Sequence, residues 1–117
     1  MVKLESLKKS YQFKKTLKEK KVHSDFFSIF ATKNFYKAKY KSNLLISFVM
    51  KKKIGNAVKR NKIRRKLKAI VQKLLKKRGA ISKDYTYIVF GKSNAYTQKQ
   101  TVLMPLMEKC FNKIKVK

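Results

Sequence analysis

Residues 51–68 read KKKIGNAVKRNKIRRKLK, and this stretch joins a tight turn directly to a strongly basic helix. Gly55 and Asn56 end whatever strand comes before them. Asn56 can cap a helix because its side-chain oxygen accepts hydrogen bonds from the first free amides. We therefore predict a helix that begins at Ala57 and runs to about residue 78, where a glycine follows as a common stop signal.

One side of this predicted helix is apolar and the rest is cationic. Arg60 and Arg64 lie one turn apart on a common face, which repels itself unless phosphate groups neutralise it. Residues 51–53 add positive charge before the turn, and the first helical amides also favour an anion. Apolar residues at intervals of three and four form a stripe that we expect to face a core: Ile63, Leu67, Ile70, Val71, Leu74 and Leu75.

The composition indicates a polyanionic partner. The chain has 117 residues, with 33 Lys and Arg against 5 Asp and Glu, which gives a net charge of +28. Such a charge destabilises a compact fold unless a polyanion neutralises it, and nucleic acid is the expected one. A hydrophobic content of 44% with 12% aromatic residues favours a folded chain over a disordered one. We predict a single RNA-binding domain over residues 1–117.

A basic helix face can also be merely solvated, but three features of this chain weigh against that interpretation. Arginines occupy positions 60, 64 and 65 in a chain dominated by lysine, Asn61 lies between two cations, and no acidic residue occurs between Asp25 and Asp84. Helices selected only for solubility usually mix charge signs. The predicted RNA contacts of the turn and helix are Lys52, Lys53, Asn56, Lys59, Arg60, Asn61, Lys62, Arg64, Arg65 and Lys68.

Several classes of protein are disfavoured. Cys110 is the only cysteine, which excludes an intrachain disulfide and two-cysteine metal motifs and fits a reducing cytoplasm. The longest apolar run, residues 44–50, is too short to span a bilayer, and residues 1–13 contain no signal-peptide core. The acidic residues are scattered and His23 is alone, so we predict neither catalytic nor metal-binding residues. We expect a cytoplasmic protein that does not associate with membranes.

The remaining periodic segments predict an α+β fold. The predicted order is a helix, a group of strands, a long helix, a strand and a final helix. This order gives a two-layer sandwich of helices against one mixed sheet. Residues 18–25 and 33–43 are predicted as polar connections, and Ser10 as the cap of the first helix. The predicted strands cover residues 26–32, 44–50 and 85–90, and the predicted helices cover residues 11–18, 57–78 and 96 to the end, the last with a proline inside it.

The strand over residues 26–32 has two mostly apolar faces. Ser28 and Phe30 share one face, whereas Phe27, Ile29 and Ala31 share the other. Sites for single-stranded nucleic acid combine aromatic platforms with flanking cations. This strand is therefore a candidate wall of an RNA-binding cleft, with Ser28 and Phe30 as its first candidates.

The run KKIGNAVKRNKIRR at residues 52–65 resembles the signature of the protein subunit of bacterial ribonuclease P. The resemblance implies a left-handed crossover in the sheet, where a right-handed one would otherwise be expected. It also implies a central cleft that holds the single-stranded 5′ leader of precursor transfer RNA. Weaker similarity covers most of the chain, at Leu7-Lys8-Lys9, Phe13, residues 27–30, Lys83-Asp84-Tyr85 and Tyr96.

Residues of the first helix and the adjacent strand would line this cleft. Leu17 occupies a position where the family often has a second aromatic residue, and Phe90 occupies the position of a family arginine, with Lys92 nearby. The predicted cleft residues are Phe13, Leu17, Phe27, Ser28 and Phe30.

The resemblance implies a protein that assists an RNA catalyst. Ribonuclease P RNA, with magnesium, would hydrolyse the phosphodiester at the mature 5′ end, and the protein would bind that RNA and the precursor without cleaving on its own. No obligate protein partner is expected. A structural RNA-binding protein, such as a ribosomal one, fits the charge and fold equally well. The hypothesis of a membrane-active or DNA-coating protein has less support, because the apolar stripe of the basic helix is expected to pack against a core.

Overall fold

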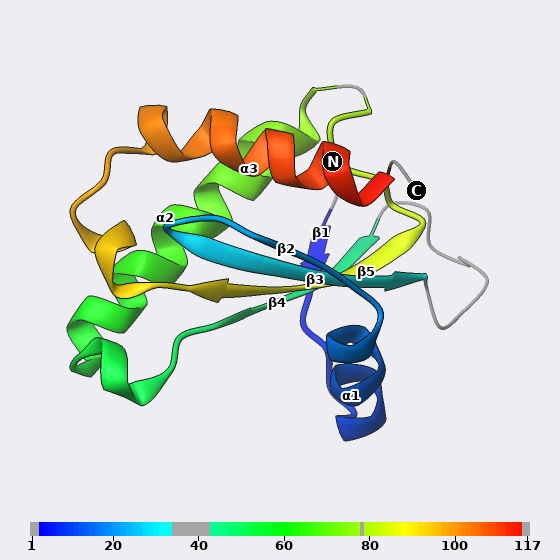
Figure 1. Ribbon diagram of the computed structural model, residues 1–117, viewed down its shortest axis with the longest axis horizontal. Helices are drawn as coiled ribbons and strands as arrows, with labels where there is room; N and C mark the ends of the chain where they lie inside the picture. The colour runs from blue at the N-terminus through cyan, green and yellow to red at the C-terminus, as the bar shows by residue number, and fades with distance from the viewer. Residues whose placement is uncertain (1–2, 34–42, 78, 116–117) are drawn as a thin grey trace.

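The computed structural model describes residues 3–33, 43–77 and 79–115, and Figure 1 shows how their helices and strands are arranged. Two of the helical segments, η1 and η2, are short 3₁₀ helices. The elements are β1 (Lys3–Glu5), α1 (Ser10–Lys18), β2 (Lys20–His23), β3 (Phe27–Lys33), β4 (Asn43–Val49), η1 (Lys52–Ile54), α2 (Ala57–Leu75), β5 (Tyr85–Gly91), η2 (Ser93–Tyr96) and α3 (Gln100–Lys115).

The strands of the described residues form one mixed sheet in the order β1-β4-β5-β3-β2. β4 is parallel to both β1 and β5, whereas β3 is antiparallel to both β5 and β2. Helix α2 connects the adjacent parallel strands β4 and β5. The mixed sheet and its helices confirm the predicted α+β fold class.

One face of the sheet carries the core. Alternation along the strands directs Ile29, Ile46 and Val89 to this face, where they join the apolar stripe of α2. Helix α3 closes the core from the same side, with the ring of Phe111 edge-on to Tyr87 at 5.0 Å between centroids. The predicted stripe is confirmed, since these members are fully buried: Ile63, Leu67, Ile70, Val71 and Leu74.

Helix α1 covers part of the opposite face, and in Figure 1 it lies across the sheet from α3. Its inward side chains, Gln12 and Thr16, are buried. Gln12 Oε1 accepts hydrogen bonds of 3.3 Å from the backbone amides of Lys8 and Lys9. The prediction that Ser10 caps this helix is wrong, because Lys9 occupies the cap position and Ser10 is the first helical residue.

Some boundaries differ from those predicted. Residues 20–23 form β2 rather than a polar connection, because they pair with β3 at the edge of the sheet. Helix α2 ends at Leu75, three residues early, and Gly79 follows with a φ of 77°. Tyr96 belongs to η2, so α3 begins only at Gln100. The predicted connection at residues 34–42 and the predicted helix end at residue 78 lie outside the described residues.

Candidate nucleic-acid interface

The turn before α2 has the geometry that its sequence predicts. Asn56 Oδ1 accepts a hydrogen bond of 2.9 Å from the backbone amide of Lys59, so Asn56 is the N-cap. Gly55 adopts φ 155° and ψ −162°, a combination available essentially to glycine alone. The turn therefore sets the direction in which α2 leaves β4 and η1.

One flank of α2 is bound to η2. Lys59 Nζ donates a hydrogen bond of 2.9 Å to Ser93 Oγ. The Nζ atoms of Lys59 and Lys62 lie 5.3 Å and 4.7 Å from the ring centroid of Tyr96. These distances are within the range of cation–π attraction. Two of the predicted RNA-binding lysines thus also hold η2 against the helix.

Lys66 strengthens the same attachment. Its Nζ donates hydrogen bonds to the backbone carbonyls of Ala95, Tyr96 and Gln98 at 3.0, 2.9 and 2.6 Å. Burial lowers the pKa of Lys66, and the neighbouring charge of Lys62 lowers it further. All three ammonium protons have partners within the protein, so this lysine fixes the loop that leads into α3.

The other flank of α2 presents its charge outward. Arg64 Nη1 donates a hydrogen bond of 2.6 Å to Asn61 Oδ1, and Arg60 Nε donates one of 3.5 Å to the carbonyl of Asn56. Both guanidinium groups are thus oriented by their own helix. We call this surface the arginine face, and it consists of Arg60, Asn61, Arg64, Arg65 and Lys68.

Little negative charge offsets this surface. The single ion pair among residues 3–33, 43–77 and 79–115 joins Lys77 and Glu108 at 3.1 Å, beyond the C-terminal end of α2. Arg65 and Lys68 are exposed. The arginine face therefore leaves its positive charge for an external anion.

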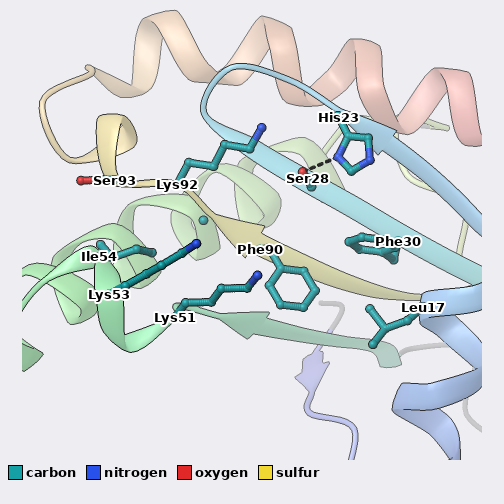
Figure 2. A pocket seen from close by; sticks show the side chains of 11 residues that line it. Leu17, His23, Ser28, Phe30, Lys51, Lys53, Ile54, Phe90, Lys92 and Ser93 are labelled. Atoms are coloured by element: carbon teal, nitrogen blue, oxygen red, sulfur yellow. Dashed lines mark hydrogen bonds between the residues drawn. The ribbon is translucent and has the colours of Figure 1, made fainter.

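A cleft of about 720 Å³ opens on the sheet face that α2 and α3 do not cover. It lies between α1 and the η1 turn, and Figure 2 shows side chains from both sides converging on it. The volume is typical of ligand-binding clefts. The lining residues are Leu17, His23, Ser28, Phe30, Lys51, Lys53, Ile54, Phe90, Gly91, Lys92 and Ser93.

Aromatic rings form the floor of the cleft. Phe30 and Phe90 meet edge to face, with 5.4 Å between centroids and 79° between planes. His23 meets Phe30 in the same way at 6.0 Å and 86°. Lys51 Nζ lies 5.8 Å from the centroid of Phe90, and Lys92 Nζ donates a hydrogen bond of 2.5 Å to the carbonyl of Ser24. An apolar floor with a cationic rim can receive bases below and phosphates above.

Comparison with known proteins decides the family. The family model for ribonuclease P matches residues 1–115. This chain belongs to the ribonuclease P protein family. It is a protein component of ribonuclease P, the ribonucleoprotein that cleaves precursor transfer RNA, and it associates with ribonuclease P RNA.

Relatives in sequence and in structure agree with this assignment. The ribonuclease P protein component of Mycoplasma capricolum subsp. capricolum is 30% identical over 109 residues, which cover 93% of this chain and 94% of the relative. That of Mycoplasma mycoides subsp. mycoides is 35% identical over 83 residues, 71% of this chain and 72% of the relative. The Staphylococcus aureus RNase P protein shares the fold with a TM-score of 0.73, 24% identity and 95% coverage of both chains. The Thermotoga maritima RNase P protein has a TM-score of 0.71 and 21% sequence identity, and the match covers 92% of this chain and 96% of the other.

The structure of this ribonuclease P protein brings several predicted residues together and separates others. Leu17, Ser28, Phe30 and Lys53 line the cleft. Lys52 is exposed in η1, beside the lysines of the rim. The basic residues of α2 divide between the η2 attachment and the arginine face. Their contacts with RNA stay predictions.

The prediction that Phe27 lines the cleft is wrong. Its side chain is 0% exposed and belongs to the core cluster, because alternation along β3 directs it to the opposite face from Ser28 and Phe30. Phe13 is half-buried on α1 and is not among the side chains that line the cleft.

Seven of the lining residues were not among the predicted site residues: His23, Lys51, Ile54, Phe90, Gly91, Lys92 and Ser93. His23 is exposed at the edge of the sheet, where it pairs with Ser28 across β2 and β3. Phe90 pairs with Ser28 from the other side, across β5. Alternation within each strand gives the correct faces, but only the strand pairing brings these residues into one row.

Other kinds of site receive no support from the described part of the chain. It contains no group of three or more His, Cys, Asp or Glu side chains that could hold a metal ion. Cys110 is buried, and burial raises the pKa of its thiol. Within the same residues, no helix combines the length and the apolar character needed to cross a membrane.

Proposed function

We propose that this protein holds the single-stranded 5′ leader of precursor transfer RNA in its cleft while the arginine face docks on ribonuclease P RNA. The observation that carries the proposal is the composition of the cleft, where Phe30 and Phe90 form a floor beneath lysines of η1 and of the segment after β5. Both surfaces extend from the same turn, so one protein can contact the catalyst and the substrate together.

An aromatic floor favours a single strand over a duplex. The faces of unpaired bases are free to stack on Phe30 or Phe90, whereas paired bases are already stacked within their helix. Lys51 and Lys53 lie at the rim, where the phosphates of a strand would run. We expect the leader to enter with its bases inward, and the mature transfer RNA, which has no leader, to leave the cleft empty.

The arginine face is suited to phosphate groups on a folded RNA. Guanidinium groups bind phosphate with two parallel hydrogen bonds, and less entropy is lost when their orientation is already fixed. Arg60 and Arg64 are held in this way by Asn56 and Asn61. Arg65 and Lys68 add two more exposed charges along the helix.

Magnesium belongs, in this proposal, to the RNA subunit. Among the described residues, no group of three or more His, Cys, Asp or Glu side chains could hold a metal ion, which supports placing magnesium on the RNA. Magnesium would activate water and stabilise the leaving oxygen during hydrolysis. The protein would screen repulsion between phosphates of the two RNAs, act without another protein partner, and function in the cytoplasm.

The test is cleavage of a precursor transfer RNA by a bacterial ribonuclease P RNA at low magnesium, with and without this protein, beside the protein alone. We expect accurate 5′ cleavage only when both components are present. Cleavage by the protein alone would contradict the assignment of the chemistry to RNA. Tight RNA binding without stimulation of cleavage would instead indicate a structural RNA-binding role.

A further inference from the structure

Helix α2 carries a row of lysines that faces η2. Lys59, Lys62 and Lys66 follow one another at intervals of three and four, which places them on one side of the helix. Their partners in η2 and the turn after it are a hydroxyl, an aromatic ring and backbone carbonyls, and none of these carries a negative charge. Like charges at this spacing destabilise a helix. The contacts with η2 therefore have to compensate for the repulsion within the row.

Lys66 is the member of the row that is fully engaged within the protein. Its three ammonium protons match three acceptors, the backbone carbonyls of Ala95, Tyr96 and Gln98. These carbonyls lie at the end of η2 and in the turn into α3, where lysine side chains commonly bind the last carbonyls of a helix. Lys66 thus fixes the C-terminal end of η2 on α2 and has no proton left for RNA.

The opposite end of η2 carries part of the cleft rim. Lys92 caps η2, since its carbonyl accepts a hydrogen bond of 3.0 Å from the amide of Ala95. Lys92 and Ser93 line the cleft, and Figure 2 shows both of them at its edge, where η2 begins. A 3₁₀ helix rises about 2 Å per residue, so the four residues of η2 separate its ends by roughly 8 Å. A shift of η2 on α2 would therefore move Lys92.

Lys92 is held from two sides. The turn between β2 and β3 holds one side, where the Lys92 amide donates a hydrogen bond of 3.0 Å to the carbonyl of Phe26 and Nζ donates to the carbonyl of Ser24. That ammonium group keeps two protons for a phosphate. On the other side η2 holds the residue. Lys66 makes three of the hydrogen bonds that attach this segment to α2, and Lys59 makes one.

We infer that Lys66 is a positioning residue for leader binding, which fixes η2 and thereby holds the ammonium group of Lys92 at the rim of the cleft. Lys92 would contact a phosphate of the leader, because sites for single strands place cations along the backbone. The inference rests on the proposed function, since it requires the leader to lie in the cleft. It also connects the two RNA surfaces, because the helix that bears the arginine face is the helix that holds this part of the rim.

The test measures the affinity of the holoenzyme for precursor and for mature transfer RNA at several salt concentrations. Lys66→Met keeps the aliphatic stem and removes the ammonium group. The preference for precursor should fall about two- to fivefold, the value of one exposed ion pair. The slope of log affinity against log salt should fall by about 0.7 for precursor, which is one phosphate contact on a single strand, and stay unchanged for mature transfer RNA.

Two double-mutant cycles separate positioning from a general loss of structure. In the Lys92→Met background, Lys66→Met should have little further effect on precursor binding, because both changes remove the same contact. In the Lys51→Met background, Lys66→Met should keep its full effect, since Lys51 belongs to the rim beside η1. A general loss of folded protein would instead abolish the contributions of both rim lysines alike, which would contradict the inference.

Lys73→Met is the matched control. Lys73 lies seven residues after Lys66 on the same side of α2, and its Nζ donates a hydrogen bond of 2.9 Å to Gln100 Oε1 at the start of α3. This variant loses the same charge and should keep the preference for precursor. If urea denaturation shows that Lys66→Met does not fold, Lys66→Gln, which retains two N–H donors, takes its place in both cycles.

The outcomes distinguish this inference from the proposed function. If the wild-type holoenzyme binds precursor no better than mature transfer RNA, the leader does not occupy the cleft and both ideas fail. If precursor is preferred but the preference survives in Lys66→Met, or if the losses of Lys66→Met and Lys92→Met are additive, the positioning role of Lys66 fails and leader binding stands.

Discussion

Asn61 Oδ1 accepts a hydrogen bond of 2.6 Å from Arg64 Nη1 on the arginine face of α2. A guanidinium has five N–H donors in a fixed fork, so this bond uses one donor and orients the others. One turn earlier, Arg60 is held by the carbonyl of Asn56. The two arginines are thus arranged by their own helix before any RNA is bound.

Removing both arginines should reduce the salt dependence of binding to ribonuclease P RNA. For Arg60→Ala with Arg64→Ala, each lost phosphate contact should lower the slope of log affinity against log salt by about 0.7–0.9. The matched control is Lys73→Ala with Lys77→Ala, which removes equal charge where the partners are Gln100 and Glu108. Titrations at several salt concentrations measure both slopes. An unchanged slope for the arginine pair would exclude these residues from the interface.

Asn61→Ala should weaken RNA binding less than Arg64→Ala, because it frees the guanidinium without removing it. In the Arg64→Ala background, Asn61→Ala should have little further effect, since neighbouring residues that act through one bond are not additive. A double-mutant cycle of dissociation constants measures this coupling. Fully additive losses would show that Asn61 contacts the RNA independently.

Gly91→Ala should destabilise the fold by about 1–3 kcal/mol through overpacking. Gly91 ends β5, and a Cβ atom there would press on the sulfur of Met50 and lie 2.9 Å from Ile63 Cγ2. Urea denaturation gives the free energy of unfolding. Met50→Ala makes room at the contact. The double variant should therefore lose less stability than the sum of the losses of the two single variants. A strictly additive result would argue against this steric cause.

Tyr87 should make stability fall at alkaline pH. The residue is fully buried and its hydroxyl donates to the carbonyl of Ser82 at 2.8 Å. Burial raises the pKa of the phenol, and the neighbouring Tyr85 raises it further. Above about pH 10 the unfolded tyrosine loses its proton while the folded one keeps it, so the free energy of unfolding falls as pH rises.

Tyr87→Phe removes this contribution and isolates it from the titration of the many lysines. At neutral pH the variant should be less stable by about 0.5–1.5 kcal/mol, the value of the lost hydrogen bond. The difference from wild type should shrink between about pH 10 and pH 11. Denaturation curves at matched pH give the difference, and a constant value across this range would contradict the assignment.

Local patterns determined the parts of the fold that the sequence predicted correctly. Asn56 caps α2 through an amide only three residues away, and the spacing of Ile63 and Leu67 requires nothing beyond helical periodicity. The short edge strands β1 and β2 were missed because they are rich in lysine and extend only through pairing with β4 and β3. Their structure comes from the sheet rather than from their own residues.

The candidate site was only partly predictable for a similar reason. Alternation placed Phe27 and Ser28 on opposite faces of β3, but the helices on one side of the sheet decided which face carries the core. His23 and Phe90 are 67 positions apart in the chain and share a row only because both strands pair with β3. Such a row follows from long-range register, which one sequence does not specify.

The most direct test of the account is the affinity of the holoenzyme for precursor and for mature transfer RNA when the cleft floor is altered. Phe30→Leu with Phe90→Leu keeps an apolar surface but removes both aromatic faces. We predict that precursor binding weakens at least about fivefold while mature transfer RNA binding is unchanged. Equal losses for both RNAs, or no loss for either, would contradict the claim that this cleft holds the leader.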